Sequence, residues 1–244
     1  MTLSSSLSRI KAISLKGFLL VLTVSLPAVA GTIVVGTPAD NAAGNCFPFG
    51  CSYGGDYQQV YTNSLFSGPI SVTGLEFFNT QVNVNATAMN TGTFTISLST
   101  TPADWNTLSA TQADNIGGDN TQVFSGSLAQ PWAFGDTLSI AFSTSFAYTP
   151  GPGANLLVNI VANGTGSAGG LIFFDTNGGN NRNTIFGRTF NFFGQVNGGV
   201  GVDSGYGLVT GFNTGSNAVP EPATFGLLGA GLAGFALLLK RVRR

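Results

Sequence analysis

The sequence has 244 residues, with ten acidic side chains, nine basic side chains and no histidine. Without histidine, neither a Ser-His-Asp triad nor a Cys-His pair can form, which excludes those classes of nucleophilic enzyme. Between residues 31 and 219 only Arg182 and Arg188 are basic, against nine acidic side chains, a net charge of −7. This balance excludes nucleic acid as a partner, because affinity for phosphate backbones depends on lysine and arginine.

Residues 1–30 have the layout of a secretory signal peptide. Basic side chains come first, at Arg9, Lys11 and Lys16, and the apolar stretch 17–26 follows. Ala28 and Ala30 then form an A-x-A cleavage site before Gly31. We expect export by the Sec machinery and a mature chain that starts at Gly31. An uncleaved anchor is the alternative, although about ten apolar residues are too few to span a membrane.

Cys46 and Cys51 are the two cysteines of the chain and enclose the sequence F-P-F-G. In an exported chain this pair predicts a structural disulfide that closes a small loop, with Pro48 and Gly50 in the turn. The alternative is a redox or metal site. Redox pairs have two intervening residues, however, and no histidine is present to complete a zinc site. We expect no cofactor.

The segment 31–218 predicts an all-β domain, an antiparallel β-sandwich or jelly roll. Apolar and hydroxyl side chains alternate over 93–99 and 137–143, which is the period of a half-buried strand. Further strands are expected over 31–36, 57–62, 70–79, 121–128, 155–162, 170–175, 184–193 and 205–212. Clusters of Gly, Asn, Asp and Pro separate them, and regular short strands with such turns favour a sandwich.

Acidic side chains offer two candidate sites. Asp114 and Asp119 flank a glycine-containing turn and are candidate calcium ligands, because hard cations prefer oxygen. The alternative is an ordinary turn, in which Asp, Asn and Gly serve the backbone. Glu76 lies among apolar neighbours that would raise its pKa, which makes it a candidate acid for glycoside hydrolysis. Alternatively, Glu76 points outward from an alternating strand, which is the interpretation we favour.

Aromatic and threonine side chains offer two candidate binding surfaces. The rings near predicted loops and strand ends are Phe47, Phe49, Tyr53, Tyr57, Tyr61, Trp105 and Trp132. Exposed rings stack on sugar faces, so Trp105 and Trp132 are the first candidates for a carbohydrate contact, with core packing as the alternative. The threonine-rich stretch 91–101 raises a remote third option, an ice-binding face.

The segment 219–244 predicts a sorting signal. Val219, Pro220, Glu221 and Pro222 precede the almost wholly apolar residues 223–239, and 240–244 hold four basic side chains. As a helix, 223–239 would rise about 26 Å, at the short end for a hydrocarbon core of about 30 Å. The prolines keep Glu221 extended and accessible to a protease. The basic end should stay in the cytoplasm by the positive-inside rule.

This tail resembles the PEP-CTERM sorting signal of Gram-negative bacteria, which is also classed with C-terminal domains of ice-binding proteins. The resemblance implies a protein held in the inner membrane, cut near the triplet by an exosortase, and released to the cell surface or an exopolysaccharide matrix. The runs Y-Q-Q-V-Y from Tyr57, L-E-F-F from Leu75 and A-N-L-L-V-N-I from Ala154 also resemble a recurring ectodomain of PEP-CTERM proteins. That ectodomain has no assigned catalytic chemistry.

Together these features predict a non-enzymatic exported protein with a structural or adhesive role and with exopolysaccharide as a candidate contact. The alternative is a carbohydrate-active enzyme that uses two carboxylates roughly 5–10 Å apart in a cleft. Ice binding is the third option.

Overall fold

The computed structural model describes residues 31–37, 44–83, 86–89, 91–163, 170–178, 182–193 and 199–215. The chain divides into two compact units, and the unit Ala28–Val219 contains all of the described residues. These residues form antiparallel strands and two short 3-10 turns, Asn63–Leu65 and Gln112–Asn115, with no α-helix among them. The all-β, antiparallel class predicted from the alternating side chains is confirmed.

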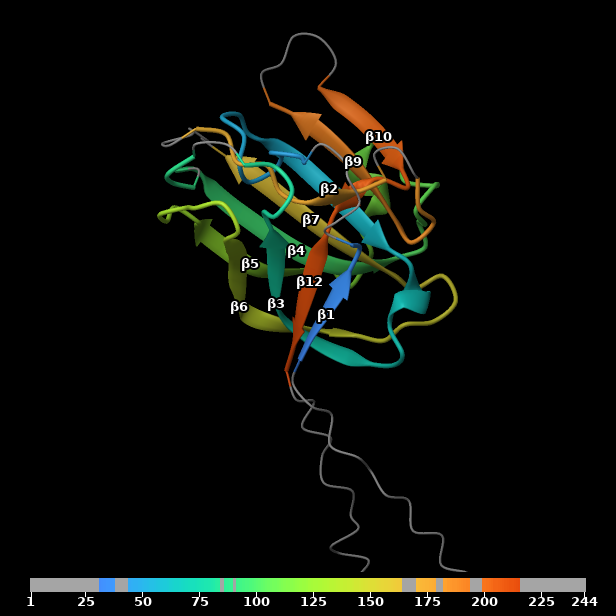
Figure 1. Ribbon diagram of the computed structural model, residues 1–244. Helices are drawn as coiled ribbons and strands as arrows, with labels where there is room; N and C mark the ends of the chain where they lie inside the picture. The colour runs from blue at the N-terminus through green and yellow to red at the C-terminus, as the bar shows by residue number, and fades with distance from the viewer. Residues whose placement is uncertain are drawn as a thin grey trace, which may run out of the picture. The chain divides into compact units, whose positions relative to one another are not determined.

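Two sheets make up the fold (Figure 1). One sheet has the order β1-β12-β3-β6, with strands β1 (Gly31–Val35), β12 (Thr210–Thr214), β3 (Ile70–Phe78) and β6 (Thr137–Tyr148). The other has the order β10-β9-β2-β7-β4-β5, with strands β10 (Val200–Ser204), β9 (Phe186–Phe192), β2 (Gly55–Tyr61), β7 (Asn155–Asn163), β4 (Thr93–Thr101) and β5 (Thr121–Ser127). A two-stranded ribbon of β8 (Thr176–Asn177) and β11 (Gly207–Leu208) accompanies them. The described residues therefore form twelve strands, more than the eight strands of a jelly roll.

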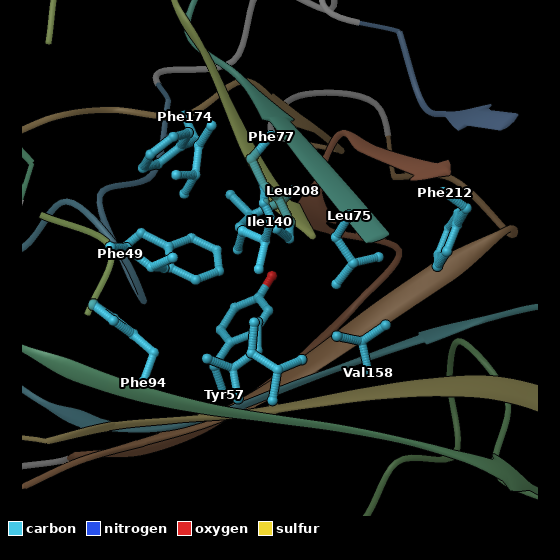
Figure 2. Close-up of a cluster of buried hydrophobic side chains, with 14 of the residues drawn as sticks. Phe49, Tyr57, Leu75, Phe77, Phe94, Ile140, Val158, Phe174, Leu208 and Phe212 are labelled. Carbon is cyan, nitrogen blue, oxygen red and sulfur yellow. The ribbon is translucent and has the colours of Figure 1, made fainter. Parts of the chain in front are cut away.

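The main core lies between the two sheets and is rich in aromatic rings. Figure 2 shows Tyr57, Phe94 and Val158 of the six-stranded sheet facing Leu75, Phe77 and Ile140 of the four-stranded sheet. Each strand contributes alternate side chains to this layer, because successive residues of a strand point to opposite faces. The alternation seen in the sequence therefore reports which face of each strand is covered.

A second, smaller apolar cluster covers the outer face of the six-stranded sheet. Val60 of β2 and Leu157 of β7 are fully buried there against Leu108, with Ala103 packed at the side. Leu108 and Ala103 belong to the long connection between β4 and β5. This connection folds back over β2 and β7, and the central strands are consequently buried on both faces.

Several predicted strands differ from the observed ones. Residues 170–175 form only an isolated bridge, Asn45 to Phe174, followed by the two-residue β8. Ile172 and Phe174 are buried in alternation, but their N–H groups donate to the carbonyls of Gly50 and Asn45, on either side of a turn and not along a strand. The expected strand 205–212 divides into β11 and β12, because Val209 donates instead to the carbonyl of Asp175. Strand β10 was not predicted.

The sandwich is joined along one side and open along the other. Ser143 Oγ of β6 donates to the Val123 carbonyl of β5 at 3.0 Å, which links the end strands of the two sheets. The remaining end strands, β1 and β10, belong to different sheets and have no further strand beside them among the described residues.

Candidate functional site

The ends of the β unit that carry the predicted processing segments lie side by side. Gly31, the expected first residue of the mature chain, pairs with Thr214 near the end of β12. The Gly31 N–H donates to Thr214 Oγ1 at 3.3 Å, and that hydroxyl donates to the Gly31 carbonyl at 2.9 Å. Gly31 and Thr214 thus lie side by side at one end of the four-stranded sheet (Figure 1).

The predicted processing residues themselves lie outside the described part of the chain. These are Ala28 and Ala30 of the signal peptide, the sorting residues Val219, Pro220, Glu221 and Pro222, and the predicted span 223–239. Within the described residues, no helix is long and apolar enough to cross a membrane.

The Cys46–Cys51 disulfide predicted from the sequence is confirmed, with 4.8 Å between the two Cα atoms. The loop that it closes inserts its two phenylalanine rings into the core. Phe47 packs against Tyr57 and Phe192 of the six-stranded sheet, whereas Phe49 packs between Phe94 of that sheet and Phe77 of the four-stranded sheet. Gly50 is needed in this turn because a Cβ there would lie 2.1 Å from the Ile172 carbonyl oxygen. Sequence proximity to a loop had made Phe47 and Phe49 candidates for an exposed surface, and both are buried.

The two tryptophans occupy different environments. Trp132 is 6% exposed, packs edge-on against Phe174 with 5.6 Å between ring centroids, and directs its indole N–H toward Asn79 Oδ1 at 3.4 Å. It is therefore a core residue and offers no open face to a sugar. Trp105 is only partly buried, on the connection over the outer face of β9, where its backbone lies against Gly187. Among the described residues no other ring packs against Trp105.

Asp114 and Asp119, in the connection between β4 and β5, each accept hydrogen bonds from nearby residues. Asp119 accepts from the Thr100 N–H at 2.8 Å and from the Thr100 hydroxyl at 2.9 Å. Asp114 accepts from the Ser109 hydroxyl at 3.2 Å. Within the described residues no group of three or more His, Cys, Asp or Glu side chains is placed to hold a metal ion. The arrangement fits the turn interpretation of the Asp-Asn-Gly sequence better than the calcium interpretation.

The same connection covers the threonine-rich stretch. Strand β4 lies between β5 and β7, and its Ser97, Ser99 and Thr101 are buried. Ser99 Oγ accepts from the Gly117 N–H at 3.1 Å, and Thr101 Oγ1 accepts from the Ala103 N–H at 3.2 Å. These hydroxyls are used to hold the connection in place. The flat exposed array that an ice-binding face requires is not present on β4.

The carboxylates on the sheets do not form opposed pairs. Glu76 is half-buried on the outer face of β3, as an outward-pointing residue should be, and it lies opposite Gly211 and Ser139. Asp56 of β2 has its pKa raised by partial burial and lies opposite Val161 and Asn191. None of these four neighbours carries a second carboxylate, which a glycosidase would need within reach.

A cluster of charged and aromatic side chains, not anticipated from the sequence, lies on β9, β10 and the residues that flank them. We refer to Arg182, Arg188, Phe190, Asp203 and Tyr206 as the arginine cluster. Arg188 donates through Nε and Nη2 to Asp203 Oδ2 at 2.9 and 2.8 Å, and its guanidinium carbon lies 4.3 Å from the centre of the Tyr206 ring. The Phe190 ring is 4.9 Å from the same carbon.

The arginine cluster contains the only two basic side chains between residues 31 and 219, and Asp203 is its one carboxylate. The Arg188 side chain is 13% exposed, and Arg182 lies 3.9 Å from the other Asp203 oxygen. The positive charge of Arg188 is paired with the Asp203 carboxylate and lies against two aromatic rings, and these contacts stabilise the β9–β10 pair. The alternation of Arg188, Phe190 and Phe192 in F-G-R-T-F-N-F was the signal that could have revealed it.

Polar side chains inside the core link β2 to β11 of the two-stranded ribbon and to β12 of the four-stranded sheet. Gln59 of β2 accepts from the Leu208 N–H and donates to the Leu208 carbonyl, both at 2.8 Å, and also accepts from the Tyr57 hydroxyl at 2.5 Å. The Tyr61 hydroxyl donates to Thr210 Oγ1 of β12 at 2.7 Å. Burial raises the pKa of both Tyr57 and Tyr61, although Arg188 opposes the rise for Tyr57. These tyrosines therefore remain neutral donors at physiological pH.

Comparison with known proteins gives one match. The family model of the PEP-CTERM protein-sorting motif matches residues 218–244. No curated protein and no solved structure matches the chain. The matched residues contain the Pro220-Glu221-Pro222 triplet, the apolar stretch and the basic end. The chain therefore carries a PEP-CTERM sorting motif, which marks it as an exported protein directed to the cell surface through an exosortase.

Proposed function

We propose that this chain is a non-enzymatic surface protein whose β-sandwich is exported, held in the inner membrane by residues 223–239, and freed by an exosortase. Its destination is the cell surface or an exopolysaccharide matrix, where it has a structural or adhesive role. The observation that carries this proposal is the match of residues 218–244 to the sorting motif. The low number of charges and the carboxylates without an opposed partner support a non-enzymatic role.

The position of β12 supports release of an intact folded unit. Strand β12 ends at Thr214, and the Gly215 N–H still donates to the Ser71 carbonyl at 2.9 Å. Only residues 216–219 separate this point from Pro220, and four extended residues reach about 14 Å at most. Every described strand lies before the triplet, so a cut there would remove no part of either sheet.

Intact-mass measurement of protein recovered from the surface or medium of the host tests the processing. We expect a chain that begins at Gly31 and ends between Pro220 and Ala223. Glu221→Ala should cause the uncleaved form to accumulate in the membrane fraction, whereas the control Asn217→Ala should be processed normally. Surface-released protein that still contains Arg244 would contradict sorting by cleavage and would leave a simple membrane anchor.

Trp105 supports a carbohydrate contact as the adhesive element. Its ring is partly exposed and has no aromatic neighbour among the described residues, and stacking on a sugar needs an apolar ring face and no ionised group. Trp105→Ala should weaken retention of the β unit on the exopolysaccharide of the host, and Glu76→Gln should leave retention unchanged. Release of reducing sugar by the purified unit, abolished by Glu76→Gln, would instead establish the carbohydrate-active enzyme.

A further inference from the structure

Strand β10 is an end strand with an exposed apolar surface. It is the outermost strand of the six-stranded sheet (Figure 1), and its Val200 and Val202 are 51% and 39% exposed. Natural end strands are usually protected by lysine, proline or a bulge. The sequence of β10, V-G-V-D-S, contains neither lysine nor proline, and its register with β9 is unbroken. Its one charge, on Asp203, is bound by Arg188.

Some backbone groups of β10 have no strand partner among the described residues, and they can be assigned from its register with β9. Phe192 donates to the Gly199 carbonyl at 2.7 Å, so those two residues form a hydrogen-bonded pair. Hydrogen-bonded and non-hydrogen-bonded pairs alternate in an antiparallel ladder, and Gly201 and Asp203 therefore bond to β9. Val200, Val202 and Ser204 direct their N–H and C=O groups away from the sheet.

These outward groups are complementary to a second copy of the same strand. An antiparallel pair with its two-fold axis at Val202 places Val202 opposite Val202, and Val200 opposite Ser204. All three residues then exchange backbone hydrogen bonds. Arg182 donates to the outward Ser204 carbonyl at 3.1 Å, and this contact is compatible with the pair because a carbonyl oxygen accepts two hydrogen bonds.

The charges select this register over its neighbours. With the axis at Val202, Asp203 lies opposite Gly201 of the other copy, so no like charges meet. A shift that places the axis at Asp203 brings two carboxylates directly opposite each other, which is destabilising. A shift the other way, with the axis at Gly201, loses one end of the five-residue overlap. Of the three registers, the one centred on Val202 is thus the one that both pairs the whole strand and avoids repulsion.

We propose that two copies of this protein pair through β10 and form a symmetric dimer. In this dimer the two six-stranded sheets join into one continuous sheet. This goes beyond display at the surface, since a displayed domain has no need to pair. A short strand pair buries a small area, so the dimer should be weak in dilute solution and should form at the high local concentration of a surface. The exposed Val202 side chains meet at its centre.

The oligomeric state of residues 31–219 tests the proposal, because this segment lies within the compact unit Ala28–Val219. Sedimentation velocity should show dimers that increase between micromolar and millimolar concentration. Val202→Pro removes a donor that points away from β9, so the fold should survive while the dimer is lost. Val202→Lys keeps the donor but sets two like charges opposite each other and should weaken the dimer about tenfold. Val202→Thr, which keeps donor and shape, should dimerise like the wild type.

Cross-linking provides a second measurement with a matched control. Val202→Cys should form an intermolecular disulfide quickly under mild oxidation, since opposite residues of a strand pair have Cα atoms at disulfide spacing. Val34 on the other end strand, β1, is 49% exposed and is the control for random collision. Equal cross-linking of Val34→Cys and Val202→Cys, monomers at every concentration, or unchanged dimerisation of a folded Val202→Pro would each overturn the proposal.

Discussion

Replacement of Gln59 by methionine tests whether the core depends on the polar link between β2 and β11. Methionine has a similar volume and length, so Gln59→Met removes hydrogen bonds while creating little cavity. The Leu208 N–H loses its acceptor at 2.8 Å, and the Tyr57 hydroxyl loses its acceptor at 2.5 Å. The Leu208 carbonyl keeps a donor, because Thr210 Oγ1 bonds to it at 3.1 Å. Two buried donors are therefore left without the partner they had.

An unsatisfied buried polar group costs about 1–3 kcal/mol, so Gln59→Met should lower the free energy of unfolding by about 3 kcal/mol. For a domain of this size that corresponds to a fall in Tm of about 10 °C. Chemical denaturation of residues 31–219, followed by tryptophan fluorescence, measures the change. Gln122→Met on the exposed face of β5 is the matched control and should be nearly neutral. A Gln59→Met protein as stable as the control would refute a structural role for this link.

Three further predictions concern stability. Trp132→Ala should cost about 3–5 kcal/mol because it empties a core site, whereas Trp105→Ala should change the free energy of unfolding by less than about 1 kcal/mol; a reversed order would contradict their assigned environments. Cys46→Ser should cost about 2 kcal/mol without unfolding the domain, since the closed loop is short, and non-reducing peptide mapping of the wild type should yield no free thiol. Burial raises the pKa of Tyr148 to about 12 and that of Tyr57 and Tyr61 above their ordinary range. Their contribution to stability is therefore complete below about pH 10, where unfolded tyrosine is protonated, and is lost as the pH rises through the folded pKa. Tm measured against pH should fall above about pH 10, less so in Tyr148→Phe, and a constant Tm would exclude the linkage.

Local chemistry in the sequence was sufficient to predict the fold class and the sorting motif. A strand with one face covered must alternate apolar and polar residues, so stretches such as 93–99 could be assigned without knowledge of their partners. The Cys46–Cys51 bond was predictable because six residues bring the two thiols within reach in any tight turn. The triplet, apolar stretch and basic end of 219–244 are contiguous, and contiguous signals need no tertiary context.

Burial of individual side chains, in contrast, was decided by contacts between distant segments. Trp132 and Phe49 stand in loops by local pattern, yet both are covered by the segment 172–174, far along the chain. The hydroxyls of β4 alternate like an exposed face, and only the folding of the β4–β5 connection back over the sheet buries Ser97, Ser99 and Thr101. Short strands such as β10 and β11 have too few residues to establish a period. Their existence depends on the ladder with β9 and on Gln59, whose side chain supplies the hydrogen bonds that a neighbouring strand would otherwise provide.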